Sequence, residues 1–171
     1  MGGSFIFYIN CRVLADELRK RVMDDPKTDK SISNIKLGHY FEYIEIESDY
    51  LINLLYKVIK KIIDSGLQEE LSFGPITEGK TNADEPGEVT IDNDIIIDSE
   101  QLKKYEDDVA MALIAHELAH SFLKHYENWE KGLENEYEAD KLAKEWGFDV
   151  DKFRNVCGPP IVKDSKLIKS F

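Results

Sequence analysis

Five consecutive residues of this chain carry the side chains that zinc-dependent hydrolysis needs: His116, Glu117, Leu118, Ala119 and His120. Residues four positions apart lie on one face of a helix, so the two imidazoles can bind one metal ion while Glu117 stands beside it. In such sites zinc lowers the pKa of a bound water, and the carboxylate accepts the proton that the water loses. The spacing therefore predicts a catalytic zinc ion bound by His116 and His120, with Glu117 as the general base.

A catalytic zinc ion usually takes three protein ligands, so one more must come from elsewhere in the chain. His125 lies five positions after His120, about 140° around a continuous helix, and is expected to be out of reach of the same ion. The HExxHxxGxxH pattern is excluded, because Leu123 and Tyr126 stand where it needs glycine and histidine. Glu136 is the better ligand, since the polar turn before it lets the chain fold back and present its carboxylate to the ion.

Two further acidic residues follow Glu136 on the same expected helix. Asp140 lies one turn later, from where its carboxylate can accept the second ring proton of a zinc-bound histidine and fix the tautomer of that ring. Glu138 is rotated by about 200° from Glu136 and is expected to face solvent. A Glu and an Asp four residues apart are also common on a solvated helix face, and it is the upstream HELAH motif that favours the metal-site interpretation.

HELAH, followed fifteen positions later by Asn135-Glu136-Tyr137-Glu138-Ala139-Asp140, resembles the gluzincin metallopeptidases, whose signature is HExxH plus a glutamate helix carrying NExxxD or ExxxD. The short spacing and small size are most similar to the single-domain minigluzincins. The resemblance covers about residues 89–147. It implies a zinc metalloendopeptidase acting on a peptide or protein substrate. It also implies an α+β fold similar to the N-terminal subdomain of thermolysin, in which a small mixed sheet packs on the zinc-binding helix, a backing helix and the glutamate helix.

The elements that must position these residues can be read from hydrophobic periodicity and turn signals. Apolar residues at helical spacing predict a long core helix over 50–65, and small alanines let neighbours approach a central helix over 106–126. The segment 72–88 is rich in glycine and proline and is expected to be a long loop. The remaining expectations are a strand at 5–9, a helix at 12–23, one or two strands in 35–47, a strand or hairpin at 88–98, a helix at 133–146 and a last turn after Asp149.

Length and composition bound the class of protein. The 171 residues most simply form one domain over 1–171, with 159–171 as a candidate extended tail. The 34 acidic and 22 basic residues give a formal charge of −12, which disfavours binding to nucleic acid or an anionic membrane surface. Cys11 and Cys157 form no metal-binding or disulfide pattern. With no export signal or membrane span in the sequence, a cytoplasmic location is expected, while oligomeric state stays open.

Several functional alternatives remain open at this stage. The chain can be a catalytically silent zinc-binding or protein-interaction module on the same fold, although such a scaffold does not need Glu117. A narrow-specificity regulatory peptidase is a second alternative. The donor that stabilises the oxyanion is undecided among His39, His125, Tyr126 and Tyr137. The strand over 89–97 is expected to bind an extended peptide, and the tail over 161–169 is a candidate autoinhibitory strand in the cleft.

Overall fold

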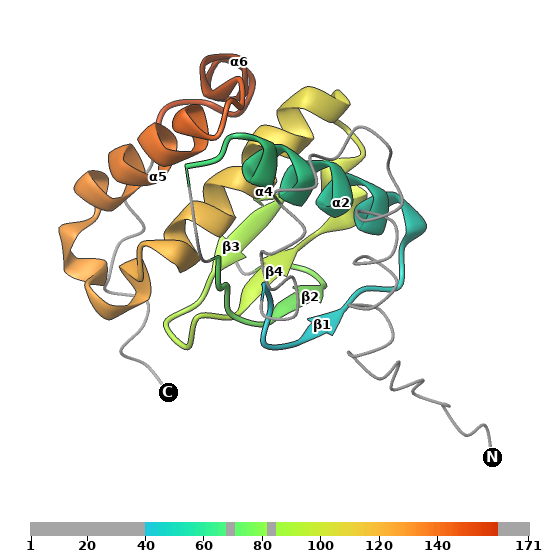
Figure 1. The fold of residues 1–171 in the computed structure, drawn as a ribbon, viewed down its shortest axis with the longest axis horizontal. Coiled ribbons are helices and arrows are strands. Elements are labelled where there is room, and N and C mark those ends of the chain that lie inside the picture. Colours follow the sequence, from blue (N-terminus) through green and yellow to red (C-terminus); the bar gives the residue numbers. More distant parts are fainter. Residues whose placement is uncertain (1–39, 68–70, 82–84, 161–171) are drawn as a thin grey trace.

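A computed structural model describes residues 40–67, 71–81 and 85–160, which form an α+β fold. Its sheet has the strand order β1-β2-β4-β3. The first three of these strands pair in parallel, and β3 joins β4 in an antiparallel hairpin at the edge (Figure 1). The strands are β1 (Ile44–Glu45), β2 (Ile76–Glu78), β3 (Gly87–Val89) and β4 (Ile95–Ile97).

The helices of the described part pack around a central helix, α4, which contacts α2, α5, α6 and the strands β3 and β4. In Figure 1, α5 lies on the left and α6 at the upper left, while α2 and α4 lie above the strands of the sheet. Two short 3₁₀ segments, η3 (His125–Glu127) and η4 (Trp129–Lys131), connect α4 to α5. The helices are α2 (Asp49–Asp64), α3 (Ser99–Leu102), α4 (Asp107–Phe122), α5 (Leu133–Glu145) and α6 (Val150–Cys157).

Helix α2 confirms the core helix expected over 50–65 and is fixed at its start by two kinds of cap. The hydroxyl of Ser48 accepts a hydrogen bond from the Leu51 amide at 3.4 Å. Glu78, at the end of β2, accepts hydrogen bonds from the amides of Glu47 and Ser48 at 2.8 and 2.7 Å. A carboxylate at this end also complements the helix dipole. Strand β2 and helix α2 are thereby held in one fixed relation.

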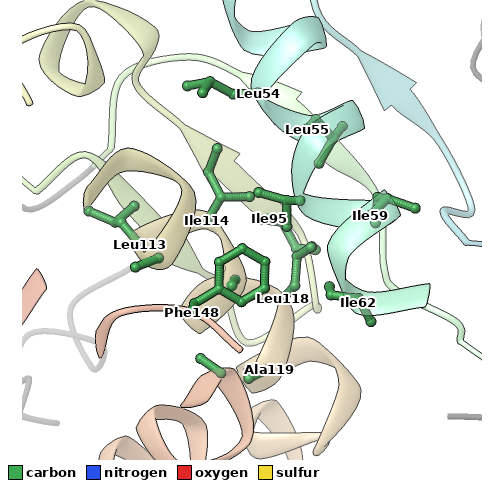
Figure 2. Close-up of a cluster of buried hydrophobic side chains, with 14 of the residues drawn as sticks. Leu54, Leu55, Ile59, Ile62, Ile95, Leu113, Ile114, Leu118, Ala119 and Phe148 are labelled. Carbon is green, nitrogen blue, oxygen red and sulfur yellow. The ribbon is translucent and has the colours of Figure 1, made fainter. Parts of the chain in front are cut away.

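Helix α4 is buried on nearly all sides, as expected for a helix at the centre of a domain. Its alanines 110, 112, 115 and 119 are fully buried, so neighbouring elements approach its backbone closely. Figure 2 shows its apolar side chains packed against those of α2, β4 and Phe148. Because the metal-ligand histidines expected from the sequence lie on this helix, their backbone is held by the core itself.

Two expectations from the sequence are wrong in detail. The segment 72–88 is not only a loop, because it contains β2, which lies between β1 and β4 in the sheet and contributes the fully buried Ile76. Its three residues are too few to show an alternating pattern, and their pairing on both sides supplies the stability. The central helix does not run to Tyr126 but ends at Phe122, since Lys124 adopts a left-handed conformation with φ of 55°.

Other expectations are confirmed or lie outside the described residues. The segment 88–98 forms the β3–β4 hairpin, the glutamate helix is α5, and Asp149 caps α6 by accepting a hydrogen bond from the Lys152 amide at 2.9 Å. The strand at 5–9, the helix at 12–23 and the tail at 161–169 fall outside the described part of the chain. Among the described helices, each is too short or too polar to cross a bilayer.

Candidate metal centre

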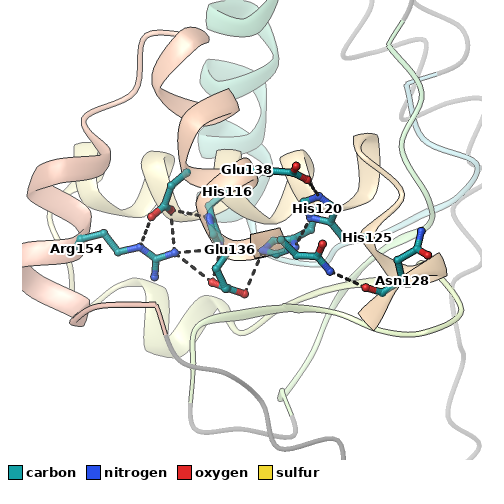
Figure 3. Close-up of polar contacts among 9 residues, drawn as sticks. His116, His120, His125, Asn128, Glu136, Glu138 and Arg154 are labelled. Carbon is teal, nitrogen blue, oxygen red and sulfur yellow. Dashed lines mark hydrogen bonds and ion pairs between the residues drawn. The ribbon is translucent and has the colours of Figure 1, made fainter. Parts of the chain in front are cut away.

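His116 and His120 project from α4 toward Glu136 on α5, and the three side chains meet at one point (Figure 3). The two Nε2 atoms are 3.0 Å apart. Glu136 straddles them, with Oε2 3.3 Å from His116 Nε2 and Oε1 3.3 Å from His120 Nε2. Both rings are buried, so three ligand atoms of the types that zinc prefers face one another in a largely dry setting.

The spacing of these atoms fits a tetrahedral ion. Zinc lies about 2.0–2.1 Å from histidine nitrogen and carboxylate oxygen, so neighbouring ligand atoms in a tetrahedral site are about 3.3 Å apart. The two Nε2 atoms are 3.0 Å apart, near this value, and each lies 3.3 Å from a different oxygen of the Glu136 carboxylate. The residues present therefore fit a divalent ion of zinc type held by two imidazoles and one carboxylate.

A second layer of contacts holds His116. Its Nδ1 lies 2.9 Å from Oδ1 of Asp140, one turn beyond Glu136 on α5, where the sequence placed an orienting carboxylate. The ring N–H does not point squarely at this oxygen, so the contact is an ion pair rather than a well-directed hydrogen bond. Arg154 of α6 donates to both Asp140 oxygens at 2.8 Å, and its Nη2 also donates to Glu136 Oε2 at 3.2 Å.

The charges of this cluster shift one another's pKa values. Burial lowers the pKa of His116, but its contacts with Asp140 and Glu136 outweigh burial and raise that pKa to about 9. Burial raises the pKa of Glu136, yet His116 and His120 hold it well below its usual range. Burial also raises the pKa of Asp140, but its contacts with His116 and Arg154 outweigh burial and lower that pKa. These shifts favour a protonated His116 between the two carboxylates, and a cation that binds there would displace that proton.

Glu117 is partly buried and lines a cleft together with the three candidate ligands. One wall of the cleft is the edge strand β3, where Gly87 lies directly against Glu117. A Cβ at position 87 would stand 2.9 Å from Glu117 Cγ, closer than real Cβ atoms approach other groups, and 3.0 Å from Leu113 Cδ2, a very tight contact. Position 87 therefore needs glycine so that the strand backbone can lie beside the carboxylate.

His125 does not belong to the ligand set found in the described residues, but the reason given by the sequence is wrong. Because α4 ends before it, His125 turns back to His120, and their Nδ1 atoms are 2.9 Å apart. Its Nε2 lies 3.1 Å from Oε2 of Glu138, which is half exposed rather than simply facing solvent. Burial, and then the nearby His120, lower the pKa of His125.

The residues considered as oxyanion donors do not gather in the cleft. Tyr126 and Tyr137 are absent from its described lining, His125 is engaged by His120 and Glu138, and His39 falls outside the described residues. Arg154 was not identified from the sequence, although it lines the cleft and contacts two site carboxylates. A lone arginine fourteen positions after Asp140 gives no signal in the sequence, because only the turn between α5 and α6 brings it back.

Comparison of the chain with family models, with curated proteins and with solved structures found no match in any of the three. The arrangement of side chains in the described residues is therefore what carries a functional argument.

Proposed function

We propose that this chain is a zinc-dependent metallopeptidase of the gluzincin type, with His116, His120 and Glu136 as zinc ligands and Glu117 as general base and acid. The observation that carries the proposal is the meeting of His116, His120 and Glu136, with ligand atoms within 4.8 Å of one another, beside Glu117 in a cleft. The α+β arrangement of a sheet, the HELAH helix, a backing helix and a glutamate helix supports a fold related to the N-terminal subdomain of thermolysin.

Zinc bound at this position would supply a Lewis acid that polarises the scissile carbonyl and acidifies a water molecule. Glu117 accepts the proton from that water and passes it to the leaving amine, as a carboxylate beside a metal can do. Asp140 holds the ring of His116, and Arg154 holds Asp140. Arg154 Nη2 also lies 3.4 Å from His116 Nε2, so in this proposal its guanidinium donates to a developing oxyanion in the cleft.

The substrate in this proposal is an extended peptide that adds to β3. In the described part of the sheet β3 pairs with β4 alone, and residues Pro86, Gly87 and Val89 line the cleft. Main-chain hydrogen bonds to an edge strand select an extended backbone with little regard to side chains. The close approach of Gly87 to Glu117 would bring such a backbone next to the general base.

The proposal includes latency through the C-terminal segment. Pro159 lines the cleft, and the described part of the chain ends one residue later, at Pro160. A variant truncated after Pro160 is expected to cleave peptides faster than the full chain at equal zinc content. An unchanged rate in a folded, zinc-loaded truncation would remove latency from the proposal without affecting the active-site assignment.

The test of the main proposal compares wild type, Glu117→Gln and Glu134→Gln for zinc content and for digestion of casein and a peptide library. Glu134 is an exposed residue at the start of α5 and serves as the matched control. We expect all three proteins to bind one zinc ion and Glu117→Gln alone to lose activity, on the order of a hundredfold to ten-thousandfold. Zinc binding without cleavage by any of them would instead favour the silent binding module or a peptidase with a narrow substrate range, which a screen of folded proteins would separate.

A further inference from the structure

His125 is placed for a role by the way α4 ends. Lys124 has φ of 55° and ψ of 40°, a left-handed conformation that stops the helix and turns the next residue back toward it. The His125 ring is consequently buried, with 4% of its surface exposed, and lies edge-on to the His120 ring at a centroid distance of 4.9 Å. A residue with this burial and no part in the ligand set calls for an explanation.

The two ring nitrogens of His125 face two different partners. Nδ1 lies 2.9 Å from His120 Nδ1, and Nε2 lies 3.1 Å from the Glu138 carboxylate, which comes from α5. His120 in turn directs its Nε2 toward His116 and Glu136. Glu138 of α5, His125 of η3 and His120 of α4 thus form one chain of contacts that ends at the candidate metal position.

Which nitrogen atoms carry a proton in this series of contacts follows from Glu138 at one end and the metal position at the other. Glu138 can only accept, so His125 Nε2 carries a proton and donates it. A metal at the site needs the free electron pair of His120 Nε2, so the single proton of neutral His120 sits on Nδ1. Neutral His125 then has an electron pair on Nδ1, which accepts from His120 Nδ1–H.

We propose that His125 is a positioning residue that, backed by Glu138, fixes the tautomer and orientation of His120 so that Nε2 faces the metal. The inference rests on the metal site of the proposed function. Asp140 does the same for His116 by direct contact, so each metal-facing imidazole is oriented by a carboxylate of α5. Because His125 lies between Glu138 and His120, Glu138 acts on the His120 ring through His125.

The test uses two substitutions at position 125 that differ in chemistry. In His125→Gln the side-chain oxygen can still accept from His120 and the amide can still donate to Glu138, whereas His125→Phe keeps the ring shape and loses both contacts. Zinc affinity is measured by competition with a chelator, and the ring tautomers are read by long-range ¹H–¹⁵N correlation spectra of ¹⁵N-histidine protein with and without zinc. Glu138→Ala is compared with Glu134→Ala, an exposed glutamate one turn earlier on α5.

We expect His125→Phe to lower zinc affinity by about tenfold to a hundredfold and to leave metal-free His120 as a mixture of tautomers. His125→Gln should stay within about threefold of wild type with His120 protonated on Nδ1, and Glu138→Ala should lose about threefold to tenfold while Glu134→Ala loses nothing. If His125→Phe does not fold, the results for His125→Gln and Glu138→Ala still test whether His125 positions His120.

Wild-type affinity in His125→Phe, or unchanged His120 tautomers in both His125→Phe and Glu138→Ala, would overturn the inference. So would a His125→Gln that loses as much affinity as His125→Phe, since its amide keeps both hydrogen bonds. If wild type binds no zinc, the proposed function fails. The metal-free spectra then still decide whether His125 sets the His120 tautomer.

Discussion

The two imidazoles of the site are held in opposite ways. His116 is surrounded by charge, because Asp140 contacts its Nδ1 and Arg154 bridges Asp140 to Glu136. His120 is backed by a second imidazole, and the nearest carboxylate on that side, Glu138, lies one residue further away and is half exposed. A direct carboxylate contact raises the basicity of a ring strongly, whereas an imidazole relay fixes its direction with little change of charge. We therefore expect the contacts around His116 mainly to strengthen its binding to the metal, and the contacts around His120 mainly to fix the orientation of its ring.

The largest loss of zinc affinity is expected at Glu136, the residue shared by the His116 and His120 sides of the site. Glu136→Ala removes the carboxylate that contacts both rings. Structural zinc sites bind their ion with roughly 10–16 kcal/mol. If each of four ligands contributes an equal share, the loss of one costs about 2.5–4 kcal/mol, which is on the order of a hundredfold in affinity. Chelator competition measures this directly. Full zinc affinity in Glu136→Ala would refute the ligand assignment.

The next largest effect compares the two supporting carboxylates. Asp140→Ala is expected to lower zinc affinity by about tenfold to a hundredfold, because it removes a direct partner of a metal-facing ring. Glu138→Ala acts through His125 and should cost less. Both residues lie on α5, so titrations of the two variants in parallel share the same helix background. Equal losses would show that the two histidines are held equally strongly.

A third prediction concerns Arg154, which contacts Asp140 on the His116 side as well as the shared Glu136. Arg154→Met removes a paired guanidinium that donates two hydrogen bonds to Asp140, and the unfolding free energy should fall by about 1–3 kcal/mol. Lys152, two residues earlier on α6, pairs with Glu106 and Asp108 at the exposed surface, so Lys152→Met should change stability little. Urea denaturation of both variants tests this. Equal losses would mean that the partly buried contacts of Arg154 contribute no more than a surface pair.

The smallest effect is a pH dependence of the metal-free protein. The folded pKa of His116 is raised to about 9 from an ordinary value of 6.5, so its stabilising contribution is complete below pH 6.5 and is lost as pH rises toward 9. The pKa values of Asp140 and Glu136 are lowered, and their contributions, present above their ordinary pKa values near 4, stay constant in this window.

Denaturation of chelator-treated protein at pH 6.5, 7.5 and 9 should show this decline. Zinc-loaded protein should not show it, because a metal-bound His116 has no proton to lose there. Stability independent of pH in the metal-free protein would indicate that Asp140 does not hold a proton on His116, which would remove the charge difference between the two sides.

Much of the site was predictable because its spacing is local. The pair His116 and His120, the backing helix and the glutamate helix follow from helical periodicity, and Asp140 follows from its distance of one turn from Glu136. The strand β2 was missed, since three residues carry no periodic signal and their stability comes from pairing with β1 and β4. Arg154 was missed because its partners lie on another helix, and the residues next to it in the sequence give no indication of those contacts.

The sequence by itself indicated the candidate ligand types, the helix that carries two of them and the residue proposed as the third. The two histidines rest on spacing within one turn of a helix, where local backbone geometry is enough, whereas Glu136 was predicted from the polar turn before it and from the resemblance of the motif. Only the tertiary structure decided how each ring is held. A single left-handed residue, Lys124, converts His125 from a residue on the wrong side of a helix into the partner of His120. Such a change of direction depends on packing between elements, which no local pattern encodes.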